Sequence, residues 1–172
     1  MFSFYHKNYN KLYTNFVELS RQNFFYQKFN LKDRLETRVM LIFLHLSIVL
    51  IVLKNKFGDK DKEQKIYDNV FQNIEYHFRE LGHGDVSVNN KMKQLNRIFY
   101  DILLKIGAIE NKKFKAQQSI MNKYFKEHTT NELNSLEMCI YAESFYNFCF
   151  DLDIKDIISG NINFKYYGST KT

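Results

Sequence analysis

The residues best suited to metal or redox chemistry are five histidines and two cysteines in a chain of 172 residues. A di-iron site in a helical bundle needs Glu-x-x-His on two helices, and this chain offers that spacing at Glu80 and His83, with Gly82 between them. Gly82 is expected to end the helix there. A zinc site needs grouped Cys and His ligands, whereas Cys139 and Cys149 stand far from any histidine pair. The sequence therefore predicts no catalytic residue, no metal site and no cofactor.

The two cysteines also bear on the compartment. On one continuous helix, their ten-residue separation would place them about 15 Å apart, which is too far for a disulfide. Both are expected to be reduced core residues, as in a cytosolic or matrix-like compartment. Gly82-x-Gly84 is too short for a dinucleotide signature, and the sequence contains no GxSxG and no phosphate-binding loop. An enzyme is therefore not expected.

His45 is a polar residue inside an otherwise apolar run, VMLIFLHLSIVLIVL, at residues 39–53. An unpaired polar group is costly in such surroundings. We expect a neutral core histidine that is hydrogen-bonded to a neighbour. Contact with haem, quinone or another ligand is the alternative.

A second polar feature is FRELGHGD at residues 78–85. Helix capping at a turn between two helices explains part of this stretch, because Gly82 can end one helix and Asp85 can begin the next. That chemistry does not require Arg79 or Glu80, so these two residues call for another explanation.

The composition predicts an all-α protein. Six Gly and no Pro favour long helices over a turn-rich β fold, and 45% hydrophobic residues can fill the core of one domain. The apolar run at 39–53 is shorter than the roughly 20 residues of a membrane span. We expect it to be the buried central helix, about residues 33–54, with a membrane-inserted segment as the alternative. The prediction is a single compact domain of about six helices over residues 1–160, followed by a C-terminal tail at 161–172.

The remaining helices are predicted from apolar residues that recur at helical spacing. The expected elements are helices at 1–22, 65–81, 88–109, 112–128 and 132–152, a short aromatic turn at 23–29, a charged loop at 54–63 and a last turn at 153–158. Side chains that can accept backbone N–H bonds are expected to begin three of the helices: Asn30 or Asp33, Asp85 or Ser87, and Thr130 or Asn131. Gly84 is expected as a second permissive position after Gly82.

The net charge of +6 and the pI near 9.1 favour an anionic partner, unless they reflect a lysine-rich solvated surface. Residues 65–109 superficially resemble a helix-turn-helix, which makes nucleic-acid or ribosome binding an alternative function. Against that reading, Met92, Leu95 and Phe99 are predicted to face inward on the second helix, which leaves few side chains to read bases.

Three stretches resemble the ubiquinol–cytochrome c chaperone family, over roughly residues 10–150. The first is Asp33-x-x-x-x-Arg38 followed by Leu44-His45, the second is FRELGHGDVSV at 78–88, and the third is Lys91-Met92-Lys93 followed by Phe99-Tyr100. The second stretch is the most specific. The chain departs from the family pattern where Arg34 replaces Thr, Thr37 replaces Gly and Val39 replaces Phe. The candidate residues that the resemblance indicates are Asp33, Arg38, His45, Arg79, Glu80, Gly82, Gly84, Asp85, Val88, Lys91, Lys93, Phe99 and Tyr100.

The resemblance implies a non-catalytic assembly chaperone for respiratory complex III that binds cytochrome b, either nascent or newly inserted, and has no small-molecule substrate. A small helical co-chaperone and a ribosome or anionic membrane surface are further partners that it suggests. No signal or transit peptide is visible, so we expect a bacterial cytoplasmic protein, peripheral at the inner face of the cytoplasmic membrane. In a eukaryote the corresponding place is the matrix side of the mitochondrial membrane.

The resemblance also suggests roles for the charged candidates. We expect Asp33, Arg38, Arg79 and Asp85 to form one buried or half-buried ion-pair cluster that holds three helices together. Such a cluster sets geometry more than it adds stability. Basic residues such as Lys91, Lys93 and Arg97 could face lipid headgroups or RNA.

Overall fold

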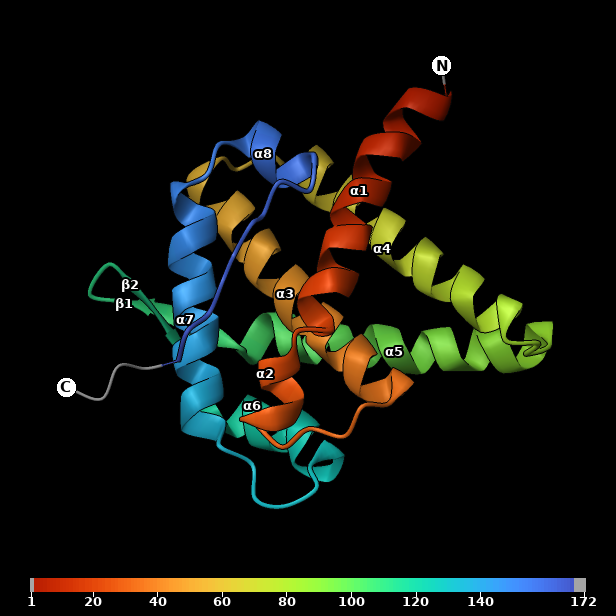
Figure 1. The fold of residues 1–172 in the computed structure, drawn as a ribbon. Helices are drawn as coiled ribbons and strands as arrows, with labels where there is room; N and C mark the ends of the chain where they lie inside the picture. Colours follow the sequence, from red (N-terminus) through yellow and green to blue (C-terminus); the bar gives the residue numbers. More distant parts are fainter. Residues whose placement is uncertain (1, 169–172) are drawn as a thin grey trace.

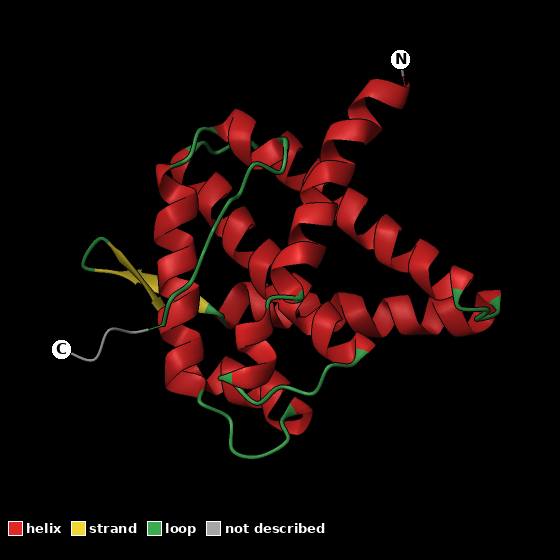
Figure 2. Cartoon of the chain, in the orientation of Figure 1, coloured by secondary structure: helices red, strands yellow, loops and turns green. Residues whose placement is uncertain are grey.

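The computed structural model describes the backbone of residues 2–168 and the side chains of residues 11–168, and helices dominate it (Figure 2). The elements are α1 (Phe2–Ser20), α2 (Asn23–Gln27), α3 (Leu35–Lys56), α4 (Lys60–Glu80), α5 (Asp85–Lys105), β1 (Gly107–Glu110), β2 (Lys113–Ala116), α6 (Gln118–Phe125), η1 (Lys126–His128), α7 (Ser135–Asp151) and α8 (Ile154–Ile158). The predicted all-α fold class is confirmed. The one departure is a small two-stranded sheet among the described residues.

Helix α3 is the centre of the domain. Helices α1, α4, α5, α6 and α7 all pack against it (Figure 1), and its residues from Val39 to Leu50 are buried without a break. By length and composition α3 could cross a membrane, yet 78% of its apolar stretch is buried inside the protein. The predicted buried central helix is therefore confirmed, and it begins and ends two residues later than expected.

Residues 107–116 form a β-hairpin, where the sequence predicted the end of one helix and the beginning of another. Ile109 lies opposite Phe114 in the antiparallel register. Asn111 and Lys112 form the turn with φ values of 49° and 63°, the left-handed geometry whose twist suits a two-residue hairpin loop. The helical prediction failed because Phe114 is buried at a strand position, where its ring stacks on Tyr146 of α7.

Helix starts also differ from those predicted. The N-cap residues are Arg34 for α3, Asp59 for α4, Gly84 for α5 and Asn134 for α7. The side chains of Asp59 and Asn134 accept backbone N–H bonds from Lys62 and Glu137, respectively, as capping residues do. The predicted caps Asp33 and Asp85 form ion pairs instead.

The described part of the predicted tail, residues 161–168, includes an extended stretch that packs on the domain. Ile162 and Phe164 are buried, and their backbone carbonyls accept hydrogen bonds from the side-chain amides of Asn15 and Gln22 at 3.2 and 3.4 Å. Residues 169–172 lie outside the described residues. The division into a domain at 1–160 and a tail at 161–172 stays a prediction.

We predict that Gly107→Ala destabilises the protein by at least about 2 kcal/mol, because it overpacks the hairpin. A Cβ at this position would lie 2.5 Å from the backbone oxygen of Lys115 and 2.6 Å from the Phe114 ring. Gly84→Ala is the matched control, since its Cβ would meet nothing within 4 Å and we expect it to cost less than about 1 kcal/mol. Denaturant unfolding measures both variants. Wild-type stability of Gly107→Ala would contradict the described packing.

Candidate functional site

The stretch at 78–88 builds the apex at which α4 turns into α5 (Figure 1). Gly82 adopts φ +87°, which confirms the predicted left-handed position. Gly84 has φ −70° and is the extended N-cap of α5, so its backbone does not need the freedom of glycine. Val88 is fully buried beneath the apex, whereas Glu80 is exposed.

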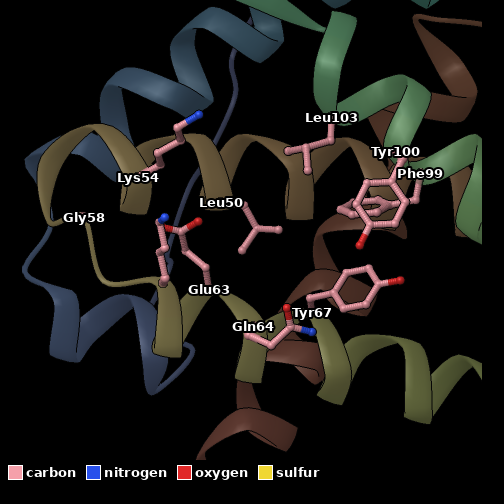
Figure 3. A pocket seen from close by; sticks show the side chains of 10 residues that line it. Leu50, Lys54, Gly58, Glu63, Gln64, Tyr67, Phe99, Tyr100 and Leu103 are labelled. Carbon is pink, nitrogen blue, oxygen red and sulfur yellow. The ribbon is translucent and has the colours of Figure 1, made fainter.

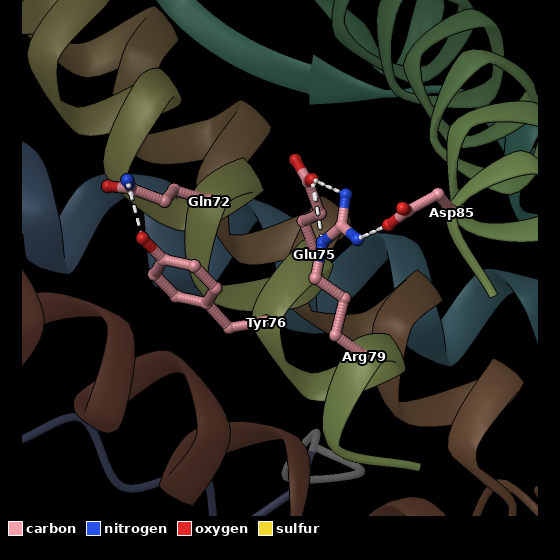
Figure 4. A network of polar contacts seen from close by, with 5 residues as sticks. All are labelled: Gln72, Glu75, Tyr76, Arg79 and Asp85. Carbon is pink, nitrogen blue, oxygen red and sulfur yellow. Dashed lines mark hydrogen bonds and ion pairs between the residues drawn. The ribbon is translucent and has the colours of Figure 1, made fainter. Parts of the chain in front are cut away.

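Arg79 connects the two helices at this apex (Figure 4). Its Nε and Nη2 atoms donate to Oε1 of Glu75 on α4 at 3.1 and 2.8 Å, and its Nη1 atom pairs with Asp85 at the start of α5. The side chains of Arg79 and Asp85 are 37% and 84% exposed. Solvent-exposed pairs of this kind contribute little stability, so Arg79 mainly orients the turn.

The four charged residues expected in one cluster form two separate pairs. Arg38 contacts Asp33 at 2.7 Å through Nη2 and 2.8 Å through Nε, with both side chains partly exposed. Within residues 11–168, no ion pair joins Arg38 or Asp33 to Arg79 or Asp85. The prediction of one buried cluster is wrong because each arginine finds a carboxylate five or six residues away, at its own end of a helix.

Phe78, the first residue of the motif, lines a cleft of about 400 Å³ between α3, α5 and α6. We call this the Phe78 cleft, and its lining residues are Leu35, Glu36, Val39, Met40, Phe78, Lys91, Gln94, Leu95, Ile98, Lys123, Tyr124, Glu127 and His128. On its other side, Phe78 and Arg38 line a smaller hollow of about 230 Å³. Phe78 therefore lies between two hollows, one lined by Lys91 and the other by Arg38.

The Phe78 cleft has apolar side chains inside and charged side chains at its border. Val39, Met40 and Leu95 are buried, while Lys123 and Glu127 are exposed. Lys91 is half-buried, with its Nζ atom 4.7 Å from the centre of the Phe78 ring, a cation–π geometry. A cleft of this kind can bind an apolar group that carries polar atoms at its border.

Asp101 on α5 positions the α6 side of the cleft, and the sequence analysis missed it. It accepts a 2.5 Å hydrogen bond from Lys123 Nζ and further bonds from Tyr124 and Lys105. These donors hold the pKa of Asp101 well below its usual range. The sequence showed the Asp101–Lys105 spacing of one helical turn, but nothing local to Asp101 indicated that α6 packs beside it.

The other candidates from the resemblance lie elsewhere. Phe99 is buried and Tyr100 is 48% exposed, and both line a different hollow of about 390 Å³ with Leu50 and Tyr67 (Figure 3). Lys93 is exposed on α5. The third stretch of the resemblance therefore divides between two faces of α5, because its residues are spaced around the helix.

His45 is fully buried, and both of its ring nitrogens have partners. Nδ1 lies 2.6 Å from the Leu41 carbonyl, so it is the protonated nitrogen, and Nε2 lies 2.6 Å from the Tyr141 hydroxyl, from which it accepts. Burial lowers the pKa of His45 from 6.5 to about 4, partly opposed by the bond to Leu41. The neutral core histidine is the arrangement observed, and it leaves no ring nitrogen available to a haem or quinone.

His45 makes folding stability depend on pH. The pKa of the folded state is lowered, so between pH 6.5 and about 4 the unfolded chain binds more protons. The contribution of neutral His45 to the free energy of unfolding is complete above pH 6.5, and it is lost as the pH falls toward 4. Denaturant unfolding should show a loss of about 2 kcal/mol from this group between pH 7 and pH 5. Imidazole NMR signals of folded His45 that titrate near pH 6.5 would contradict this prediction.

The described residues provide neither a metal site nor a helix with side chains placed to read DNA bases. No group of three or more His, Cys, Asp or Glu side chains in this part of the chain is placed to hold a metal ion. Cys139 and Cys149 are buried free thiols, and burial raises the pKa of Cys139 to about 11. Leu95 and Phe99 face the core on α5, as predicted, which weakens the helix-turn-helix interpretation.

Comparisons with known proteins point to one family. The model of the ubiquinol–cytochrome c chaperone family matches residues 27–164. The fold is similar to the crystal structure of the Cbp3 homolog from Brucella abortus, with a TM-score of 0.71 and 22% sequence identity over 92% of this chain and 88% of that chain. At this identity the structural likeness concerns the fold alone. A search of curated proteins found no match.

Proposed function

This chain belongs to the ubiquinol–cytochrome c chaperone family, and we propose that it is a non-catalytic assembly chaperone for respiratory complex III whose client is newly made cytochrome b. The family match over residues 27–164 carries this proposal, because that range contains the whole central helix, the apex and the Phe78 cleft. Activity in the proposed role consists of binding and release.

The Phe78 cleft is the proposed client site. Cytochrome b is a polytopic membrane protein, so its newly made segments are apolar with polar ends. Buried Met40 and Leu95 offer apolar contact to such a segment, while Lys91, Lys123 and Glu127 lie where its polar ends would emerge. Arg79 links α4 to the start of α5, and the Asp101 contacts link α5 to α6 at the border of the cleft.

The proposed place of action is the inner face of the cytoplasmic membrane, or the matrix side in a mitochondrion. The net charge of +6 supports contact with an anionic membrane surface or a ribosome. A small helical co-chaperone is a further proposed partner. Family membership and the net charge support these proposals.

We predict that cells lacking this chain lose complex III. A reduced-minus-oxidised spectrum of their membranes should lack the cytochrome b and c-type bands of complex III, while the bands of other oxidases remain. Cells that regain the chain from a plasmid provide the control. Unchanged bands together with normal ubiquinol–cytochrome c reductase activity would overturn the proposed role.

We predict that filling the mouth of the Phe78 cleft prevents client binding. Gln94 is exposed at the cleft, so Gln94→Trp should block entry without disturbing the core. Gln72→Trp, on an exposed position of α4 outside this cleft, is the matched control. Co-purification of cytochrome b with the affinity-tagged chain from solubilised membranes should fall at least fivefold for Gln94→Trp and stay near wild type for Gln72→Trp. Equal recovery with both folded variants would place the client elsewhere.

A further inference from the structure

The hollow of about 230 Å³ on the other side of Phe78 from the Phe78 cleft has a composition of its own. It is bordered by Arg21 at the end of α1, Arg38 on α3 and His77 on α4, and we call it the Arg21 hollow. Its lining combines apolar side chains with these basic ones and contains no Asp or Glu. The volume is below the roughly 300 Å³ at which drug-sized pockets begin, so the hollow suits a compact ligand.

The floor of the Arg21 hollow is apolar. It forms where α1 packs against α3 and α4 (Figure 1). Val39, Ile42, Ile74 and Phe78 belong to the lining and are buried, and Val17 of α1 is half-buried in the same lining. Water beside such side chains finds few hydrogen-bond partners, so a hydrocarbon group that takes its place is favoured.

Arg21 carries the positive charge of the hollow that no carboxylate neutralises. Arg38 already pairs with Asp33, which contacts its Nε and Nη2 atoms. Arg21 and His77 are exposed at the border of the hollow. Among residues 11–168, the Arg21 side chain forms neither an ion pair nor a hydrogen bond. Its guanidinium is therefore available to an anionic ligand, and it can donate two parallel hydrogen bonds to a carboxylate.

The Tyr13 hydroxyl is a second available donor in the same lining. Within the part of the chain that the structure describes, this hydroxyl has no hydrogen-bond partner. Burial raises the pKa of Tyr13, and the charge of Arg21 only partly opposes that rise, so the hydroxyl stays protonated at neutral pH. The influence of Arg21 also places its guanidinium near Tyr13. Glu80 acts on Tyr13 as well, but it lines the adjacent polar hollow and not this one.

We propose that the Arg21 hollow binds a monocarboxylate with a short apolar body. The body would lie on the floor formed by Val39, Ile42 and Ile74, and the carboxylate would accept hydrogen bonds from Arg21 and Tyr13. One unneutralised guanidinium matches one negative charge, which favours a carboxylate over a phosphate dianion. The same chemistry is offered by a free carboxylic acid and by the C-terminal residue of a polypeptide. The inference does not depend on the proposed client of the Phe78 cleft.

The first test titrates isocaproate and its uncharged counterpart isocaproamide into the isotope-labelled full chain and follows the NMR signals. We expect isocaproate to bind with a dissociation constant of about 1 mM or tighter, with nuclear Overhauser contacts from its methyl groups to Ile74 and Phe78. Isocaproamide should bind at least tenfold more weakly, because it lacks the charge. Equal binding of the acid and the amide, or no saturable change at the signals of the hollow, would overturn the proposal.

Arg21→Gln tests the proposed anchor. Because Arg21 is exposed and forms no ion pair among the described residues, this variant should fold like the wild type. It should bind isocaproate at least tenfold more weakly and lose the preference for the acid over the amide. Arg97→Gln is the matched control, since it removes the same charge from an exposed position of α5 outside the hollow, and its affinity should stay within twofold of wild type. Equal affinities of the two variants would contradict the role of Arg21.

A second pair of ligands distinguishes the two sources of the carboxylate. N-acetyl-leucine presents the branched side chain, the carboxylate and the last peptide group of a polypeptide, whereas isocaproate presents only the branched body and the carboxylate. At least fivefold tighter binding of N-acetyl-leucine would support the C-terminal residue of a chain as the ligand. Tighter binding of isocaproate would support a free acid. Absence of binding by both would overturn the proposal, and none of these results depends on recovery of cytochrome b.

Discussion

The burial of α3 on every side is the constraint on which the rest of the structure depends. An apolar helix with no polar face must be covered all round, and each fully buried large side chain contributes about 1.5–3 kcal/mol to that preference. Coverage comes from α1, α4, α5, α6 and α7. His45 and Ser47 interrupt the apolar surface, and Tyr141 gives His45 a partner that lipid could not supply. The contact therefore favours the protein interior for a helix that is otherwise apolar enough for a membrane.

Coverage of α3 also determines where clefts form. Helices α4 and α5 meet at the apex and separate toward their other ends, where α3 lies between them (Figure 1). The N-terminal turns of α3 are covered by α5 and α6 incompletely, and the Phe78 cleft lies at that gap. Asp101 links α5 to α6 beside this gap through Lys123 and Tyr124.

The sequence was sufficient for the features that depend on periodicity and composition. The all-α class, the central helix, the inward residues of α5 and the neutral state of His45 all follow from patterns within one segment. The missed features depend on contacts between segments. Phe114 is buried in a strand because Tyr146 lies beside it, and Asp101 matters because α6 brings Lys123 and Tyr124 to it. Asp33 and Asp85 were expected as caps, but nearby arginines compete for the same carboxylates.

The distribution of polar groups suits the proposed role of a chaperone for an apolar client. Its own most apolar helix is sealed, and the cleft beside that helix is bordered by lysines and glutamates that discourage indiscriminate apolar contact. The cleft therefore combines an apolar interior with a charged border that excludes wrong partners, which is how selectivity arises without a deep pocket.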